Sequence, residues 1–307
     1  MIFKFSKKTI KERLVQKIIK MVRKTNKPSK SLKIPKLILI TAKFLSFISP
    51  RLVTLFAAKL FTSPIKHKIP RRESEMYHKS IQKRVKIPAI NKDVVVYEYG
   101  KSDKKVLLVH GWSGRGTQLV KIADELLLHD FSTVSFDAPA HGDAPGKTTI
   151  MLEFIATIAY LEKQYGPFEA AVGHSLGGIA LLNATKDGLA IKRLVTIGSA
   201  DIIEDIIADF VRKLQLKPKA VVWLEKHFEK KYNKTMNSLS AYLSAKEITI
   251  PVLIVHDNDD DEVPVKCAVH IHRNLQNGEL MITKGLGHRR ILGDKEVIEK
   301  TIDFIKN

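Results

Sequence analysis

The sequence predicts an α/β fold in which helices cover both faces of a mostly parallel sheet. From about residue 92 onward, short apolar runs alternate with amphipathic helical patterns, the order typical of βαβ units. Several of these runs, such as 250–256 (IPVLIVH), are apolar along nearly their whole length. Strands of that kind are buried on both faces, as in the parallel sheet of an α/β domain.

The elements of this domain can be placed in chain order. Strands are expected at 93–98, 105–110, 132–137, 168–173, 193–198, 250–256 and 279–284. Helices are expected at 117–129, 148–165, 176–188, 264–275 and 294–306. Residues 199–248 interrupt the alternation, because they carry charged helical patterns and no strand. An insertion of this length between two strands predicts a helical lid at about 199–248 on a domain that spans 91–307.

The first 90 residues lack the alternation and are predicted to form a separate, basic helical extension. They hold 24 Lys and Arg against 3 Asp and Glu, a balance of +21, whereas the whole chain carries +20. The rest of the chain is therefore close to neutral, at −1 (20 − 21). Since the extension contains no recognised nucleic-acid module, no nucleic-acid partner is expected.

The extension begins with a pattern that suits a membrane surface. Four apolar residues recur at i, i+4 spacing with basic residues between them: Ile10, Leu14, Ile18 and Val22. Residues 37–62 are richer in apolar side chains, but Pro50 and three basic residues interrupt them, so no spanning helix is expected. Two interpretations of residues 1–60 stay open: contact with an anionic membrane surface, or packing of two or three helices on the main domain.

The cellular compartment is inferred from the absence of export and disulfide signals. The chain has a single cysteine, Cys267, so it cannot form a disulfide within itself. No cleavable secretory signal follows the long basic lead-in. We therefore expect a cytoplasmic protein, with or without peripheral contact with the inner membrane surface.

The clearest chemical motif is Gly173-His174-Ser175-Leu176-Gly177, a G-x-S-x-G sequence. It ends a predicted strand and begins a predicted helix, the context in which a serine hydroxyl projects from a tight turn. Glycines at the flanking positions remove side chains that would collide with the neighbouring strand and helix. We predict that Ser175 is a nucleophile and that His174 is a packed residue of the turn, not a second base.

A nucleophilic serine needs a base, and the base needs an acid that orients it. The strand 250–256 runs into the acidic loop 257–262, and the strand 279–284 runs into a loop that ends in His288. A serine, an acid and a histidine at successive strand ends form one known arrangement of a catalytic triad. His288 is therefore the predicted base, and an aspartate of the 257–262 loop is the predicted acid.

Stabilisation of an oxyanion requires backbone N–H groups close to the nucleophile. The loop 110–115 (HGWSGR) directly follows the strand 105–110. We assign one donor to the Trp112 N–H and the other to the Leu176 N–H, which follows the nucleophile.

Five motifs in order resemble the α/β-hydrolase superfamily: HGW at 110–112, FDAPAHG at 136–142, GHSLGG at 173–178, HDNDDDEVP at 256–264 and GLGHRRIL at 285–292. The resemblance covers about residues 92–307 and is strongest to bacterial serine hydrolases with an HGW loop and a GLGHRRIL block. It implies the α/β-hydrolase fold. The family pattern H-G-x-x-D-x-x-V-P, placed on 256–264, implies Asp260 as the acid, with Asp259 as the alternative. Asp257 stands where that pattern has glycine, and DAPAHGDA lacks the usual serine and first glycine of its block.

These residues predict a serine hydrolase that acts on a small ester or a lipid ester without a cofactor. A thioesterase or acyltransferase would use the same triad, and a non-catalytic binding protein on the same scaffold is a third alternative. No metal site is expected, because the acidic run lacks EF-hand spacing and no Cys/His cluster occurs.

Three arginines are candidates for binding an anionic group of the substrate: Arg115, Arg289 and Arg290. For Arg289 and Arg290 the alternative is structural, namely pairing with acidic side chains or with carbonyls at a helix end.

Overall fold

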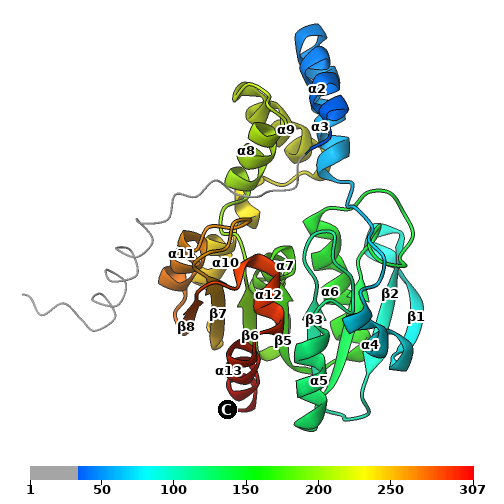
Figure 1. Ribbon diagram of the computed structural model, residues 1–307, viewed down its shortest axis with the longest axis vertical. Helices are drawn as coiled ribbons and strands as arrows, with labels where there is room; N and C mark the ends of the chain where they lie inside the picture. The colour runs from blue at the N-terminus through cyan, green and yellow to red at the C-terminus, as the bar shows by residue number, and fades with distance from the viewer. Residues whose placement is uncertain (1–33) are drawn as a thin grey trace, which may run out of the picture.

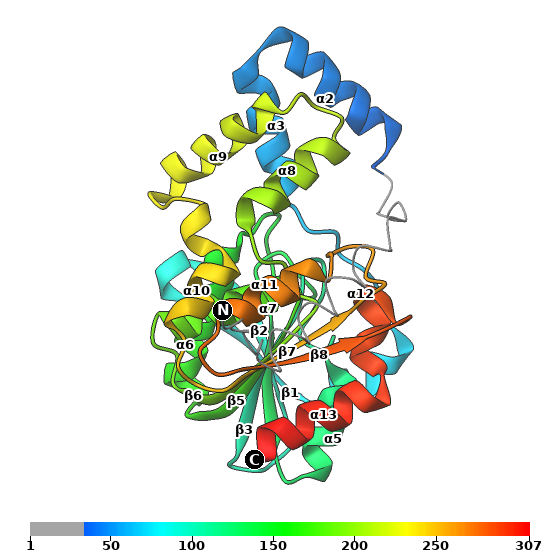
Figure 2. The same ribbon diagram turned by 90° about the vertical axis from the view of Figure 1, so that its left-hand side faces the viewer.

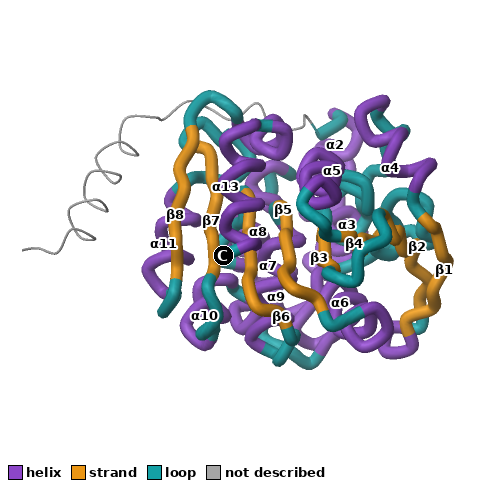
Figure 3. The backbone as a smooth tube through the Cα atoms, turned by 90° about the horizontal axis from the view of Figure 1, so that it is seen from below, coloured by secondary structure: helices purple, strands orange, loops and turns teal. Residues whose placement is uncertain are grey.

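The computed structural model describes residues 34–307 and contains one eight-stranded sheet. The strand order is β1-β2-β4-β3-β5-β6-β7-β8, and Figure 3 shows the strands side by side in this order. β2 is antiparallel to both of its neighbours, whereas all pairs from β4 to β8 are parallel. The strands are β1 (Ile81–Ile87), β2 (Lys92–Tyr99), β3 (Lys105–Val109), β4 (Ser132–Asp137), β5 (Phe168–His174), β6 (Ile191–Ile197), β7 (Val252–Asp257) and β8 (Gly278–Thr283).

Helices cover both faces of this sheet, as the apolar strands require. The helices are α2 (Lys36–Ile48), α3 (Pro50–Phe61), α4 (Ser74–Lys79), α5 (Val120–Leu128), α6 (Met151–Tyr165), α7 (Leu176–Lys186), α8 (Ile203–Lys213), α9 (Lys219–Tyr232), α10 (Ala241–Glu247), α11 (Lys266–Asn274), α12 (Gly287–Arg290) and α13 (Lys295–Lys306). One core cluster contains apolar residues of α5 and α13, and the other contains those of α6, α7, α10 and α11. This is the predicted α/β-hydrolase architecture, and every predicted strand is present.

Four helices, α2, α3, α8 and α9, project together beyond one edge of the sheet (Figures 1 and 2). The ring of Phe61 on α3 packs against α8 and α9. Its centroid lies 5.1 Å from that of Phe210 on α8 and 5.5 Å from that of Phe228 on α9. We call this four-helix unit the cap. Helices α8 and α9 of the 199–248 insertion, predicted as a lid, therefore pack with helices of the N-terminal extension. Helix α10 packs on the body beside α7 and α11.

The N-terminal extension differs from expectation at residues 81–87. They form β1, an edge strand that pairs with β2, and not part of a helical region. Most of its side chains are exposed, so it lacks the apolar run that revealed the other strands. The amphipathic helix expected around Ile10–Val22 lies outside the described residues. Within residues 34–307, no helix is long and apolar enough to cross a membrane.

Candidate active site

Ser175 lies on the turn between β5 and α7, at the edge of the sheet that faces the cap. Its backbone has φ 52° and ψ −118°, a region that non-glycine residues rarely adopt. The Ser175 N–H donates to the Ile197 carbonyl at the end of β6, over 2.8 Å, and so holds the strained turn against the sheet. A strained turn of this kind, between a strand and a helix, is what the G-x-S-x-G motif predicts.

Two glycines make this turn sterically feasible. A Cβ on Gly177 would collide with the carbonyl oxygen of Val109 in β3. A Cβ on Gly173 would lie 2.6 Å from the backbone nitrogen of Gly178. Because backbone cannot move out of the way as a flexible side chain can, the G-x-S-x-G spacing is a packing requirement here.

His288 and Asp260 form a buried pair close to this turn. His288 Nδ1 lies 2.7 Å from Asp260 Oδ2, and both side chains are almost fully buried. A Cβ on Gly198, just after β6, would lie 3.3 Å from the His288 ring. The imidazole is therefore next to the end of β6, to which the Ser175 N–H is hydrogen-bonded. In the neutral imidazole, an Nδ1–H that donates to Asp260 makes Nε2 the nitrogen that can accept a proton.

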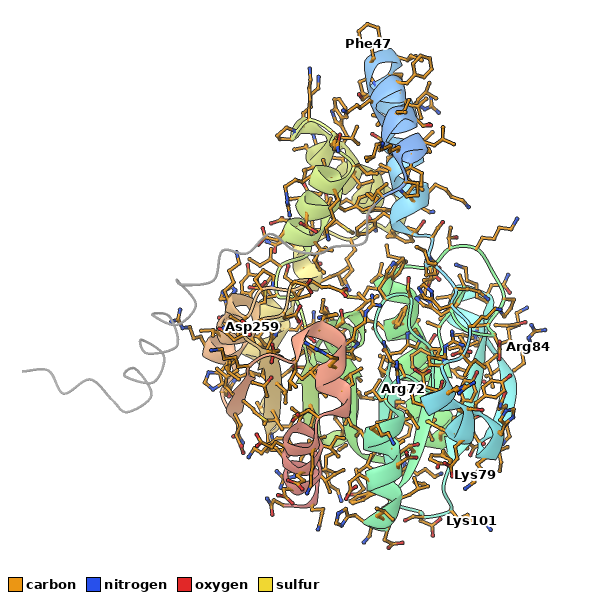
Figure 4. The ribbon with its side chains drawn as sticks, in the orientation of Figure 1. Phe47, Arg72, Lys79, Arg84, Lys101 and Asp259 are labelled. Atoms are coloured by element: carbon orange, nitrogen blue, oxygen red, sulfur yellow. The ribbon has the colours of Figure 1, made fainter. Side chains whose placement is uncertain are left out.

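Asp260 is held as a carboxylate by its surroundings. Its Oδ1 accepts from the Glu262 and Val263 N–H groups at 2.9 and 2.8 Å. Burial alone would raise the pKa of Asp260, but the hydrogen bond and charge of His288, together with the other donors, lower it below its ordinary value. Asp259, by contrast, is exposed at the surface of the body (Figure 4). This placement favours Asp260 over Asp259 as the partner of the histidine.

His174 packs behind His288, as expected of a residue of the turn. Its Nε2 donates to the His288 carbonyl at 2.9 Å, and the two rings lie 4.7 Å apart. Burial lowers the pKa of His174 to about 3, so the ring is neutral at physiological pH. The neutral, buried imidazole of His174 therefore supports the backbone of His288.

The loop after β3 lies directly against Ser175. A Cβ on Gly111 would be 3.1 Å from Ser175 Cβ and 2.9 Å from His174 Nδ1, so the next residue, Trp112, begins beside Ser175. The Gly111 N–H donates to Gln118 Oε1 at 2.8 Å, which fixes the loop. Leu176 is the first residue of α7, where helix geometry leaves N–H groups without an intrahelical acceptor.

Two neutral histidines secure this loop from the other side. His110 Nε2 accepts from the Ala138 N–H at 3.1 Å, and His141 Nε2 accepts from the Ser113 N–H at 3.0 Å. Burial lowers the pKa of His110 to about 4 and that of His141 to about 2. Rings that stay neutral keep these acceptor nitrogens, so the loop geometry does not depend on pH near neutrality.

The arrangement agrees with the sequence comparison to known families. The model of the alpha/beta hydrolase family matches residues 106–299, which is more than half of the chain. The chain belongs to the α/β hydrolase family. A comparison with curated proteins found no sequence match to this chain.

Solved structures of bacterial and archaeal esterases have the same fold. An esterase from Exiguobacterium antarcticum is 16% identical with a TM-score of 0.59, and covers 74% of this chain and 100% of its own. An esterase from Pyrococcus furiosus is 18% identical with a TM-score of 0.61, and the match covers 80% of this chain and 96% of the esterase. Est1E from Butyrivibrio proteoclasticus, whose structure contains ferulic acid, is 19% identical with a TM-score of 0.54. The match covers 72% of this chain and 99% of Est1E. Likeness at this level of identity establishes the fold alone.

Asp257 is an important residue of this α/β hydrolase that the sequence does not reveal. It is fully buried at the end of β7, and its carboxylate accepts four hydrogen bonds. Oδ1 accepts from the Asp259 and Gly287 N–H groups at 2.9 and 3.0 Å, and Oδ2 from Thr283 Oγ1 and the Leu286 N–H at 2.7 and 3.1 Å. The departure from the family's glycine therefore ties the loop that carries His288 to the loop that carries Asp260.

The three arginines are all engaged within the protein. Arg115 is buried, donates to the His67 carbonyl and lies 3.7 Å from the buried Glu73 carboxylate. Its charge is already paired within the protein, which favours a structural role, and its contact with substrate stays a prediction. Arg289 Nε lies 3.2 Å from Glu262 Oε1, and Arg290 donates to the carbonyls of residues 286 and 285 at 2.9 and 2.7 Å.

No metal site is formed by the arrangement of the described residues. Within residues 34–307, no group of three or more His, Cys, Asp or Glu side chains is placed to hold a metal ion.

Proposed function

We propose that this protein is a serine hydrolase that cleaves carboxylic esters through an acyl-enzyme. Ser175 Oγ attacks the ester carbonyl while His288 Nε2 takes the hydroxyl proton, and Asp260 holds the imidazole and stabilises the imidazolium that forms. The tetrahedral oxyanion is bound by the Trp112 and Leu176 N–H groups. The intermediate collapses when His288 protonates the leaving alcohol.

The second half of the cycle uses the same groups. A water molecule gives a proton to His288 and attacks the acyl carbonyl. The second tetrahedral intermediate then collapses as His288 returns the proton to Ser175 Oγ, which releases the carboxylic acid and restores the free enzyme. No cofactor enters either half. The observation that carries the proposal is the 2.7 Å contact between His288 Nδ1 and Asp260 Oδ2, beside a strained elbow serine.

A thioester is the second candidate substrate class, because the same nucleophile and oxyanion donors act on both. We place the ester first because esterases are among the structural neighbours. Turnover of p-nitrophenyl esters and of acyl thioesters of matched chain length distinguishes the two. Transfer of the acyl group to an added alcohol, in competition with water, would identify an acyltransferase.

The decisive variant is Ser175→Ala, with Ser102→Ala as its matched control. Ser102 lies on a loop away from the site, where its hydroxyl donates to the Asp130 carbonyl. We expect Ser175→Ala to lose turnover by several orders of magnitude while Ser102→Ala retains it. A wild-type protein that binds esters without cleaving either class would instead be a binding protein.

A further inference from the structure

The cap carries an unusually apolar tip, formed by the α2–α3 hairpin (residues 36–61). Among the twelve large apolar side chains that are exposed within residues 34–307, seven belong to this hairpin: Leu37, Ile40, Phe44, Phe47, Ile48, Leu52 and Leu55. Phe47 is 92% exposed and lies at the far end of the molecule, opposite Lys101 (Figure 4). Such a concentration of exposed apolar area marks an interaction surface.

The exposed side chains form one face of α2. Leu37, Ile40, Phe44 and Phe47 follow i, i+3, i+7, i+10 spacing, which places them on one side of the helix. The hairpin packs on the rest of the cap through other residues, such as Ala57 and Phe61. The apolar face is therefore not part of the packing that holds the described structure together.

The charge carried by the hairpin itself is exclusively positive. Four exposed basic residues lie on the hairpin: Lys36, Lys43, Arg51 and Lys59. The sequence contains no Asp or Glu from residue 13 to residue 72. Apolar side chains bordered by cations, with no acidic residue between them, match an interface of acyl chains and anionic headgroups.

A groove beside the tip is also lined by both apolar and basic side chains. It has a volume of about 460 Å³ and lies between α3 and α9. Leu55 and Trp223 give it apolar walls, and Arg51 and Lys226 add two cations to its lining. These groups suit a phosphate headgroup joined to an acyl chain.

We propose that the α2–α3 hairpin docks on an anionic lipid bilayer, with its apolar face in the headgroup region and Arg51 and Lys226 on lipid phosphates. A second copy of the chain would bring two sets of cations together. The chain's own residues 1–33 would do the same, because they hold 12 Lys and Arg against one Glu. Charge therefore favours the bilayer over both of these occupants. The interaction is peripheral, and it does not depend on the proposed ester hydrolysis.

Docking in this orientation would hold the hydrolase site at the membrane. The cap stands over the sheet edge that carries the site loops (Figure 1). The segment that leaves α3 is bonded to the body beside the oxyanion loop, where the Ile65 N–H donates to Ser113 Oγ at 3.0 Å. The Thr149 N–H also donates to the Thr62 carbonyl, at 2.8 Å.

The test uses an environment-sensitive fluorophore on the full-length chain. The native thiol is removed by Cys267→Ala, and a new one is introduced by Phe47→Cys or, as the matched control at the opposite end, by Lys101→Cys. Vesicles of phosphatidylglycerol and phosphatidylcholine should shift the emission of the Phe47→Cys probe to shorter wavelength, and lipids with a quencher on the acyl chain should quench it. The Lys101→Cys probe should show neither change, and pure phosphatidylcholine should give a much weaker response.

Apolar insertion is separated from simple charge attraction by substitutions in unlabelled protein. In 0.5 M salt, where surface attraction is screened, Phe44→Asp and Phe47→Asp should each lower vesicle binding tenfold or more, on the order expected for burying one aromatic side chain. Leu128→Asp should not, although Leu128, which lies away from the cap, has an exposure between those of Phe44 and Phe47. All three variants should unfold at the wild-type temperature, because the substituted side chains are exposed.

Several results would overturn the proposal. One is a Phe47→Cys probe that does not respond to vesicles, or that responds no more than the Lys101→Cys probe. Another is a probe already in an apolar environment without lipid, because the hairpin is then covered by a second copy or by the chain's own N-terminus. Ser175→Ala should bind vesicles like the wild type, so failure of the catalytic proposal would leave this result unaffected.

Discussion

Replacement of Asp257 by asparagine should destabilise the protein and slow catalysis, although the residue touches neither Ser175 nor substrate. An asparagine oxygen can keep the two bonds from the Asp259 and Gly287 N–H groups. Its NH₂ group would then face the Leu286 N–H, a donor against a donor, so that bond is lost. A buried hydrogen bond to a charged group is worth about 1.5–3 kcal/mol, which is the expected loss in free energy of unfolding at pH 7.

The effect of Asp257→Asn should depend on pH in a defined direction. Burial alone would raise the pKa of Asp257, but the bonds from Thr283, Gly287, Leu286 and Asp259 outweigh burial and lower it. A lowered pKa adds stability that is fully present above the ordinary aspartate value of about 3.9 and is lost as the pH falls through the folded-state value. The difference in free energy of unfolding between the wild type and Asp257→Asn should therefore be largest near neutral pH and shrink below about pH 4.

The assay is urea unfolding, combined with turnover of a soluble ester. Because Gly287 immediately precedes His288, a looser loop misplaces the base, and turnover should fall by about 10- to 100-fold. Asp259→Asn is the matched control, since Asp259 is exposed on the same loop and should tolerate the change. A stable and fully active Asp257→Asn variant would refute the role of this carboxylate in fixing the two loops.

Two further predictions concern the residues around the histidine. Asp260→Asn should lower turnover on the order of 10⁴-fold and Asp259→Asn only slightly, and the reverse ranking in steady-state kinetics would transfer the acid's role to Asp259. Arg289→Ala and Arg290→Ala should affect anionic and neutral esters alike, because both side chains are paired within the protein. A Michaelis constant that rises for anionic esters only would restore the substrate-binding interpretation.

The strands were predictable from sequence because burial on both faces leaves a continuous apolar run. β1 was not, since its exposed edge position requires no such run. The order of Ser175, Asp260 and His288 along the chain indicated a common edge of the sheet. The role of Asp257 was hidden, because it arises only when β7 and β8 lie side by side and bring Leu286 and Gly287 to its carboxylate.

Which helices form the cap could not be predicted from the sequence pattern either. The helical insertion at 199–248 was recognisable by its length and by its lack of strands. Its partner helix α3 lies about 150 residues earlier in the chain, and contacts at that separation leave no periodic signal. Phe61 between Phe210 and Phe228 is a packing arrangement that only the folded structure reveals.

Covalent labelling by a fluorophosphonate tests the central claim most directly, because the reagent reacts with a serine only when a base activates it. Wild-type protein should take up one phosphonyl group, and mass spectrometry should locate it on the peptide that contains Ser175. Ser175→Ala should take up none, while Ser102→Ala should label like the wild type. Labelling that survives Ser175→Ala, or a folded wild-type protein that does not react, would contradict the assignment of Ser175 as an activated nucleophile.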